Sequence, residues 1–327
     1  MGAHIFLVGA DNFEVCVQRG VYGCVEPKRE WNQAEIIAGI KTIQTGDLVF
    51  FYVKNRGVYG VWRVVGSPFY DNTPVWTDRD QMFPYRFCFE AAIGDFPMSV
   101  DLNDILDLRD HGWMWTFDLN PVQQKNQYKI MMSEARELIR LLLRNNSIRK
   151  APKPIEVPYL RPDTARSIKI DFSSNNQPGR IRYEGWLNAW LMDSLSQGKF
   201  QELFGEYNEF LNLVPTTYNK VMDAFLTHIA KIDGIEVLYK FSCIELKTDR
   251  ASIEDLTQIL KYEEWIRRRL AAGDPHMVQS VLLAHSFAED VIEYVRKRHE
   301  IEERTVRLIT YMLDTSSNVV QLSLSDQ

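Results

Sequence analysis

The chain has 327 residues, which is too long for one typical core and predicts two domains. Apolar residues make up 45% and charged residues 25%, as in an ordinary soluble globular protein, and no window approaches eighteen apolar residues. We therefore expect a cytoplasmic protein with neither a signal peptide nor a membrane span. The net charge of −6 excludes a global positive field, so any nucleic-acid binding must come from local basic patches.

The first hundred residues carry the pattern of short strands. β-branched and aromatic runs bounded by Gly, Asn, Asp or Pro predict strands at 4–8, 47–53, 57–65 and 85–89. A hairpin turn is expected at 54–57 and a helix at 33–42. This part of the chain predicts a small sheet that is either closed or strongly curved.

The middle of the chain changes character twice. An amphipathic pattern predicts a helix at 123–145, and a segment rich in proline with few periodic apolar residues follows at 151–179. We place a linker there, at 149–180, between domains at 1–148 and 181–327.

The last part predicts an α/β core with a mixed sheet flanked by helices. Helices are expected at 181–197, 199–212, 252–272 and 287–299, and strands within 221–247 and at 278–284 and 306–313. The four cysteines (Cys16, Cys24, Cys88 and Cys243) lack zinc-binding spacing and are expected to be reduced thiols.

One strand and the helix after it carry the residues that a metal-dependent hydrolase needs. Glu245 and Lys247 are two residues apart and point to the same side of a strand. Gln258 and Tyr262 are four residues apart and share one face of the next helix. Carboxylates hold a hard cation, and a lysine can orient a water molecule or stabilise developing charge.

A hard cation is usually held by more than one carboxylate, and two acids near Glu245 in the sequence are candidates for the second. The Asp233-Gly234 dipeptide predicts a hairpin that brings 221–232 beside 235–247. A two-residue loop sets Asp223 opposite Ile244, whereas a three-residue loop or one bulge sets it opposite Glu245. Glu236 is the rival acid, across a shorter hairpin, and we prefer Asp223.

These motifs resemble the PD-(D/E)xK nuclease superfamily, in the branches with a QxxxY helix such as the RecB-like and NucS-like nucleases. The resemblance implies a restriction-endonuclease-like fold that hydrolyses phosphodiesters with Mg²⁺ or Mn²⁺. It implies that Asp223, Glu245 and Glu184 bind the metal, that Lys247 acts on the water and that Gln258 and Tyr262 complete the site. The basic run Arg267–Arg269 is a candidate for gripping phosphates, or equally a solvated helix end.

Residues 1–120 resemble the EVE domain, a PUA-like fold related to YTH domains. The similarity rests on the motifs at 20–23, 46–52, 57–64, 67–71, 74–77 and 83–86. It implies an aromatic cage for one flipped, modified base, with Tyr22 and Trp76 as cage residues and Asp11 or Asn12 as the hydrogen-bonding partner of the base edge. Trp31, Trp62 and Tyr52 are expected in the core or at the rim.

Together the two resemblances predict a modification-dependent restriction endonuclease. It would bind a modified cytosine in double-stranded DNA through the first domain and cleave with the second. Many such nucleases cut both strands as dimers, so the resemblance also implies a homodimer. Two alternatives remain open: a nuclease that reads modified RNA, and a catalytically silent nucleic-acid-binding protein.

Overall fold

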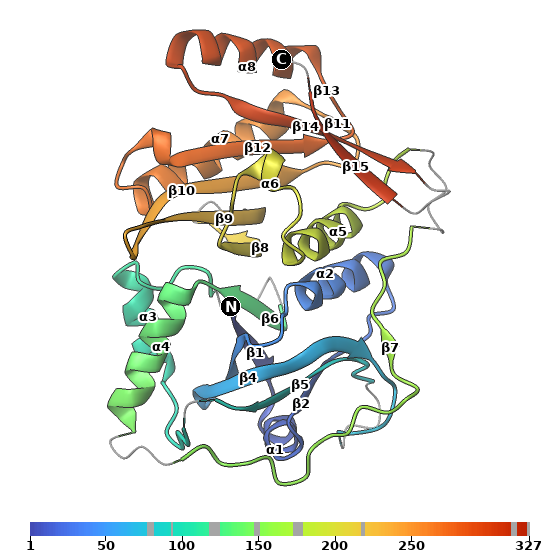
Figure 1. The fold of residues 1–327 in the computed structure, drawn as a ribbon, viewed down its shortest axis with the longest axis vertical. Helices are drawn as coiled ribbons and strands as arrows, with labels where there is room; N and C mark the ends of the chain where they lie inside the picture. Colours follow the sequence, from blue (N-terminus) through green and yellow to red (C-terminus); the bar gives the residue numbers. More distant parts are fainter. Residues whose placement is uncertain are drawn as a thin grey trace. The chain divides into compact units, whose positions relative to one another are not determined.

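The computed structural model describes residues 1–76, 82–92, 94–117, 125–146, 151–172, 179–216, 220–314 and 319–325. Internal contacts divide the chain into two compact units, Met1–Lys169 (unit 1) and Ile170–Gln327 (unit 2). Each unit combines helices with its own mixed sheet (Figure 1). The boundary lies inside the range where the sequence predicted a linker.

Unit 1 is built on a sheet with the strand order β2-β5-β4-β3-β1-β6, and β7 pairs with β4. The strands β1 and β3 are parallel, and the other neighbours are antiparallel. The elements are β1 (Ala3–Val8), α1 (Ala10–Arg19), β2 (Val21–Cys24), α2 (Glu30–Lys41), β3 (Leu48–Val53), β4 (Gly57–Tyr70), β5 (Tyr85–Ala91), α3 (Leu102–Asp110), β6 (Gln127–Ile130), α4 (Met132–Asn145) and β7 (Arg166–Ser167). The four strands predicted in this region are confirmed.

The sheet of unit 1 was predicted to be either closed or strongly curved, and the closed form is wrong for the described strands. The end strands β2 and β6 pair with β5 and β1 and not with each other. A side chain spans part of the gap between them: the Tyr22 hydroxyl donates to the carbonyl oxygens of Leu7, at 3.1 Å, and Asn126, at 3.4 Å. The sheet is therefore open on this side, where a cavity described below is found.

Several elements of unit 1 differ from the prediction. Helices α1 and α3 were not predicted, and the helix expected at 123–145 begins only at Met132. The strand β6 precedes it, because Tyr128 and its neighbours pair antiparallel with β1. Sheet pairing outweighs the helical periodicity there, while residues 123–124 lie outside the described part.

Much of the proline-rich segment belongs to unit 1. The backbone amides of Val157 and Tyr159 donate to carbonyl oxygens of Gln18 and Arg19, and β7 extends the edge of β4. The predicted linker 149–180 is therefore attached to unit 1 at several points of its described length, although most of its described residues are exposed. Residues 149–150 and 173–178 lie outside the description.

Unit 2 has a six-stranded mixed sheet with the order β15-β14-β12-β10-β9-β8, in which β10, β12 and β14 are parallel. Its elements are α5 (Glu184–Ser196), α6 (Gln201–Phe204), β8 (Glu209–Pro215), β9 (Val221–Ile232), β10 (Ile235–Leu246), β11 (Arg250–Ala251), α7 (Ile253–Arg269), the 3₁₀ helix η2 (Pro275–Met277), β12 (Val278–Ala284), β13 (Ser286–Phe287), α8 (Glu289–Glu302), β14 (Val306–Asp314) and β15 (Val319–Leu324). This arrangement confirms the predicted mixed sheet with helices.

The helix predicted at 199–212 is wrong. The short helix α6 ends at Phe204, and β8 then pairs antiparallel with β9. Phe210 and Leu211 are buried beside β9. A helix at this position would leave that edge of the long strand β9 without a pairing partner.

The predicted hairpin is present and contains one bulge. Asp233 and Gly234 both have positive φ, at 50° and 82°, as a tight two-residue turn requires. The first register runs from the turn to the pair formed by Leu238 and Ile229. Beyond Tyr239 the register shifts by one residue, and Lys240 pairs with His228. The shifted register runs to Ile244 opposite Ala224, so that Asp223 follows opposite Glu245.

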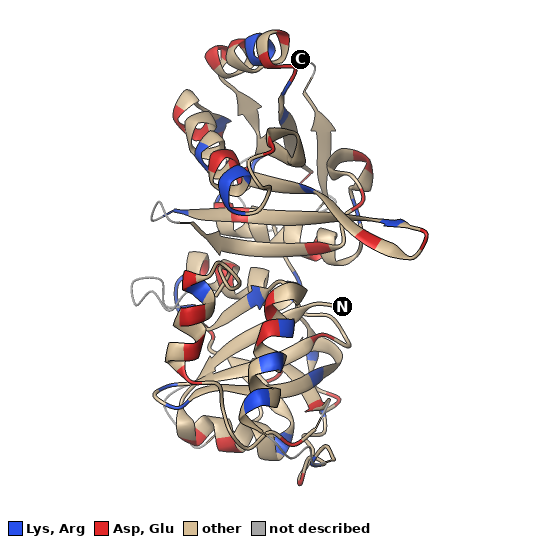
Figure 2. Ribbon diagram, turned by 90° about the vertical axis from the view of Figure 1, so that its left-hand side faces the viewer, with Lys and Arg blue, Asp and Glu red and all other residues tan. Residues whose placement is uncertain are grey.

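Charges of both signs alternate on the surface. Figure 2 shows Lys and Arg beside Asp and Glu along the helices that face the viewer. None of the described helices is long and apolar enough to cross a membrane.

Candidate active site

The sheet of unit 2 places an acid and a lysine at the end of a central strand. Glu245 is 2% exposed and lies near the carboxyl end of β10, between β9 and β12. Lys247 follows the strand, and its Nζ lies 2.8 Å from Glu245 Oε1. The two side chains thus form a largely buried ion pair, on the same side of the strand as the alternation predicts.

Helix α7 brings the glutamine and the tyrosine to this pair. The helix begins with a capping box in which Ser252 and Asp255 exchange hydrogen bonds. One turn further, Gln258 Nε2 donates to Glu245 Oε1 at 2.7 Å and lies 2.8 Å from the Tyr262 hydroxyl. Tyr262 in turn donates to the backbone oxygen of Val221, at 3.0 Å, so the QxxxY pair connects β10 to the start of β9.

Asp223 occupies the position opposite Glu245. It is 9% exposed, and its Oδ2 accepts a hydrogen bond from the backbone amide of Leu246 at 2.8 Å. The rival Glu236 is exposed near the hairpin tip and pairs with Lys231 at 3.1 Å. Glu236 is therefore at the opposite end of the strand and does not join the site.

Glu184 reaches the same lysine from another helix. It is the first residue of α5, and its Oε2 lies 3.2 Å from Lys247 Nζ. Asp255 Oδ1 lies 3.9 Å from the same nitrogen, a contact that the sequence reasoning missed. The sequence contains one signal for this contact: the capping-box pattern at 252–255 indicates that Asp255 lies in the first turn of the helix after Lys247.

The crowding of carboxylates changes their protonation. Burial, followed by the charges of Glu245 and Glu184, raises the pKa of Asp223 well above its usual range. Burial also raises the pKa of Glu245, against the opposing effect of Lys247. Burial would lower the pKa of Lys247, but the charges of Glu245 and Glu184 outweigh it and raise that pKa. Lys247 is therefore protonated, while the raised pKa values of Asp223 and Glu245 shift both acids toward their neutral forms.

The donor chemistry of the cluster fits a hard divalent cation. Glu245 Oε2 is buried and has no hydrogen-bond partner in the protein, and carboxylate oxygens are the ligands that Mg²⁺ and Mn²⁺ prefer. In the present positions, no three His, Cys, Asp or Glu side chains of the described residues form a metal-ligating group. Lys247 Nζ lies between two of the acids, 3.2 Å from Glu184 Oε2 and 2.8 Å from Glu245 Oε1.

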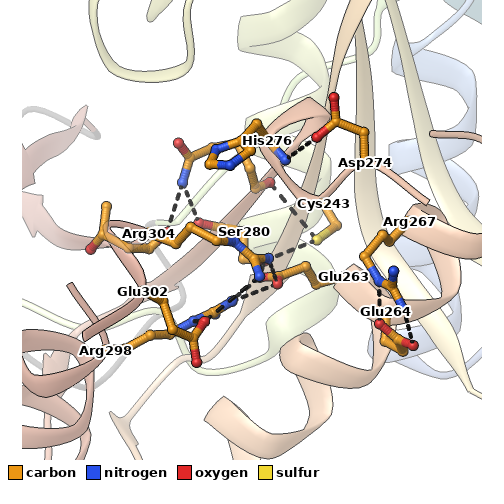
Figure 3. A network of polar contacts seen from close by, with 12 residues as sticks. Cys243, Glu263, Glu264, Arg267, Asp274, His276, Ser280, Arg298, Glu302 and Arg304 are labelled. Atoms are coloured by element: carbon orange, nitrogen blue, oxygen red, sulfur yellow. Dashed lines mark hydrogen bonds and ion pairs between the residues drawn. The ribbon is translucent and has the colours of Figure 1, made fainter. Parts of the chain in front are cut away.

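A buried ion cluster anchors the other side of α7. Glu263, next to Tyr262, accepts hydrogen bonds from both end nitrogens of Arg298, at 3.1 and 2.6 Å, and from Ser280 Oγ at 2.6 Å. Arg304 also pairs with Glu263, and Figure 3 shows the Glu263 carboxylate enclosed by these partners. The cluster fixes α7 to α8 and β12 and so fixes the helix that carries Gln258 and Tyr262.

The basic end of α7 is partly neutralised. Arg267 and Arg268 both pair with Glu264, and Arg267 also donates to the backbone oxygen of Gly273 at 3.0 Å. These two arginines therefore have partners within the helix end, which weakens the interpretation as a phosphate grip.

Unit 1 contains a cavity beside the gap in its sheet. Its volume is about 370 Å³. Three of the four predicted base-binding residues, Asn12, Tyr22 and Trp76, line it, together with Cys16 and Phe83 among others. Asp11 is exposed on α1 and does not line the cavity. Its neighbour Asn12 is therefore the candidate for contact with a base edge.

The two aromatic candidates differ in their accessibility. Tyr22 is 5% exposed, and its ring packs against those of Phe6, Phe51 and Phe87. It is a core residue that presents only part of its surface to the cavity. Trp76 is half-buried, and its indole nitrogen donates to Cys16 Sγ at 3.3 Å.

Close packing holds Trp76 in position. A Cβ on Gly23 would lie 2.7 Å from Trp76 Cη2, so only glycine allows this approach. The guanidinium of Arg86 lies 5.3 Å from the centroid of the Trp76 ring, and it is itself buried and bonded to Asp71 and Tyr159. The sequence assigns no role to Cys16, Gly23 or Arg86, because their contacts with Trp76 join residues that are far apart in the chain or depend on the loop that carries Trp76.

The comparisons with known proteins identify no family. No protein-family model matches the chain, and no curated protein matches it. Among solved structures, a crystal structure of a Pseudomonas putida protein is 13% identical with a TM-score of 0.31, over 43% of this chain and 99% of that one. An NMR structure of a Rhodopseudomonas palustris protein is 12% identical with a TM-score of 0.30, over 43% of this chain and 92% of that one.

Proposed function

We propose that this protein is a metal-dependent endonuclease directed by a modified base, in the manner of a modification-dependent restriction enzyme. The observation that carries the proposal is the convergence of Glu184, Asp223, Glu245 and Lys247 at one end of the unit 2 sheet. An unpartnered buried carboxylate oxygen on Glu245 adds to it. Charges of this kind are costly to bury and are typical of functional sites.

The acids supply the binding site for the cation. Asp223, Glu245 and Glu184 would hold Mg²⁺ or Mn²⁺ through carboxylate oxygens. When bound, such an ion polarises a phosphate oxygen and lowers the pKa of a water molecule. Binding at Asp223 also requires that this residue release its proton, since the raised pKa favours the neutral form.

Lys247 contributes a fixed positive charge. Because neighbouring carboxylates raise its pKa, it stays protonated at neutral pH and does not serve as a base. Its ammonium can orient the attacking water and stabilise the charge that develops on the phosphate. Gln258 and Tyr262 hold Glu245 in the orientation this requires.

The cavity of unit 1 would select the target. A volume of about 370 Å³ leaves room for one base removed from the stack. Trp76 offers the stacking surface, worth about 1–3 kcal/mol for a base, and Asn12 offers an amide for its edge. Because the chain is negatively charged overall, recognition of one base in a cavity fits it better than binding of DNA through a broad basic surface.

Cleavage of matched plasmids tests the proposal. The full-length protein is incubated with unmodified DNA or DNA containing 5-methylcytosine or 5-hydroxymethylcytosine, in Mg²⁺ or in EDTA. We expect Mg²⁺-dependent cleavage of modified DNA alone. Equal inertness on all plasmids would refute the restriction function, and matched RNA substrates then distinguish an RNA nuclease from a protein that only binds.

A further inference from the structure

A buried asparagine lies beside the proposed metal site. Asn188 is 3% exposed and stands four residues after Glu184 on α5, so the two share one face of the helix. Its Nδ2 donates to the backbone oxygen of Asp223 at 2.9 Å. The side chain therefore contacts the strand that carries the central acid.

That hydrogen bond fixes the orientation of the amide. A backbone carbonyl only accepts hydrogen bonds, so the nitrogen of Asn188 must face Asp223. Its Oδ1 then points elsewhere, and it is buried without a hydrogen-bond partner in the protein. A buried acceptor without a partner is unfavourable, and a bound water molecule or cation would satisfy it.

A second unpartnered oxygen belongs to the same neighbourhood. Glu245 Oε2 is also buried without a partner. Asp223 connects the two residues, because its backbone oxygen binds Asn188 and its carboxylate binds the amide of Leu246, next to Glu245. Amide and carboxylate oxygens together are the usual donor set for a hard divalent cation.

We propose that Asn188 Oδ1 is a direct ligand of the divalent cation bound by Asp223, Glu245 and Glu184. This inference rests on the proposed function, since it names a further residue of the same site. The competing role is structural: through Nδ2 alone, Asn188 would position Asp223 without touching the ion.

Replacement of the oxygen by sulfur separates the two roles. Thiolates prefer soft metals to Mg²⁺, so Asn188→Cys should weaken Mg²⁺ binding at least about tenfold. The same variant should bind Cd²⁺ more tightly than the wild type and gain an ultraviolet sulfur-to-cadmium absorption band. Ser194→Cys is the matched control, because Ser194 is also buried on α5 and contacts none of the four acids in the described structure.

The measurements are calorimetric titrations of the full-length protein with Mg²⁺ and Cd²⁺, combined with ultraviolet spectra. Asn188→Asp is the second variant: it keeps an oxygen but lacks the amide donor, and should retain Mg²⁺ binding if Asn188 is a ligand. If the folded Asn188→Cys protein binds both metals as the control does, or if Asn188→Asp loses Mg²⁺, the ligand role is refuted. A wild-type protein that binds no Mg²⁺ would instead overturn the metal site of the proposed function itself, and this inference with it.

Discussion

Lys247 is the residue at which the electrostatics of unit 2 converge. It contacts Glu245 and Glu184 directly, and the elevated pKa keeps it charged. We expect Lys247→Ala to lower the rate of DNA cleavage by about 10²–10³-fold, as for the loss of one preorganised donor. Lys261→Ala, at an exposed position of α7, is the control and should cleave at the wild-type rate. If Lys247→Ala cleaves DNA at the wild-type rate, Lys247 takes no part in catalysis.

Asp223 illustrates a conflict between stability and function. Its raised pKa means that the native state retains a proton that the unfolded state releases above pH of about 4. Native stability contributed by this group therefore falls as pH rises from that value toward the folded pKa. Asp223→Asn removes this loss and keeps an oxygen acceptor for the amide of Leu246.

We accordingly expect Asp223→Asn to raise the melting temperature at neutral pH in EDTA while abolishing cleavage. The increase should shrink as the pH is lowered toward 4, and calorimetry at several pH values measures it. A variant that melts below the wild type at neutral pH would contradict the assigned protonation state.

Trp76 carries the prediction for unit 1. Trp76→Ala removes the stacking surface of the cavity, so the preference for modified DNA should fall by about tenfold or more, in line with about 1–3 kcal/mol for a stacked base. Binding to modified and unmodified duplexes measures this preference. Trp31→Ala, which alters an exposed tryptophan on α2, is the control. An unchanged preference in Trp76→Ala would place base recognition elsewhere.

At the scale of elements, α7 joins two different polar environments. One side contributes Gln258 and Tyr262 to the candidate site, and the other is fixed by Glu263 to Arg298 and Arg304. Glu263→Ala removes the buried partner of Arg298 and Arg304 and leaves Glu302, which is more exposed, as their remaining acid. This loss should lower the free energy of unfolding by about 3–5 kcal/mol.

The adjacent residue provides the matched control for that prediction. Glu264 pairs with two arginines at the helix surface, and Glu264→Ala should cost less than about 1 kcal/mol. Urea unfolding of both variants gives the comparison. Equal losses would show that the Glu263 cluster does not anchor α7.

Local sequence predicted the hairpin and most of the central strands and helices, and it missed several others. Asp233-Gly234 specifies a tight turn through its own backbone preference, so β9 and β10 were found. The bulge at Tyr239 was left open because it depends on packing along the whole ladder. The helix α3 had a readable signal that was missed, since Asp101 caps it by accepting from the amide of Asp104.

The strands β6 and β8 could not be read locally because their partners supply their stability. Each lies at an edge of a sheet, beside β1 or β9, in a segment whose apolar spacing also fits a helix. Likewise, the grouping of Glu245, Lys247, Gln258 and Tyr262 followed from two short periodicities, whereas Asn188 became visible only through its unpartnered oxygen.

On the scale of the whole molecule, the two units carry separate tasks in the proposed function. Each has its own sheet and core, and the segment through Lys169 is packed into unit 1 by β7 and Tyr159. The segment before Lys169 therefore belongs to unit 1, although its proline-rich composition predicted a linker.

The most direct measurement of the central claim compares two proteins on one substrate. Wild type and Glu245→Gln are incubated with a plasmid containing 5-methylcytosine and its unmodified counterpart, in Mg²⁺ at neutral pH. We predict that the wild type linearises or fragments only the modified plasmid and that Glu245→Gln, in which a proposed metal ligand has lost its charge, leaves both intact. Equal cleavage by the two proteins, or no cleavage of modified DNA by the wild type, would contradict the account.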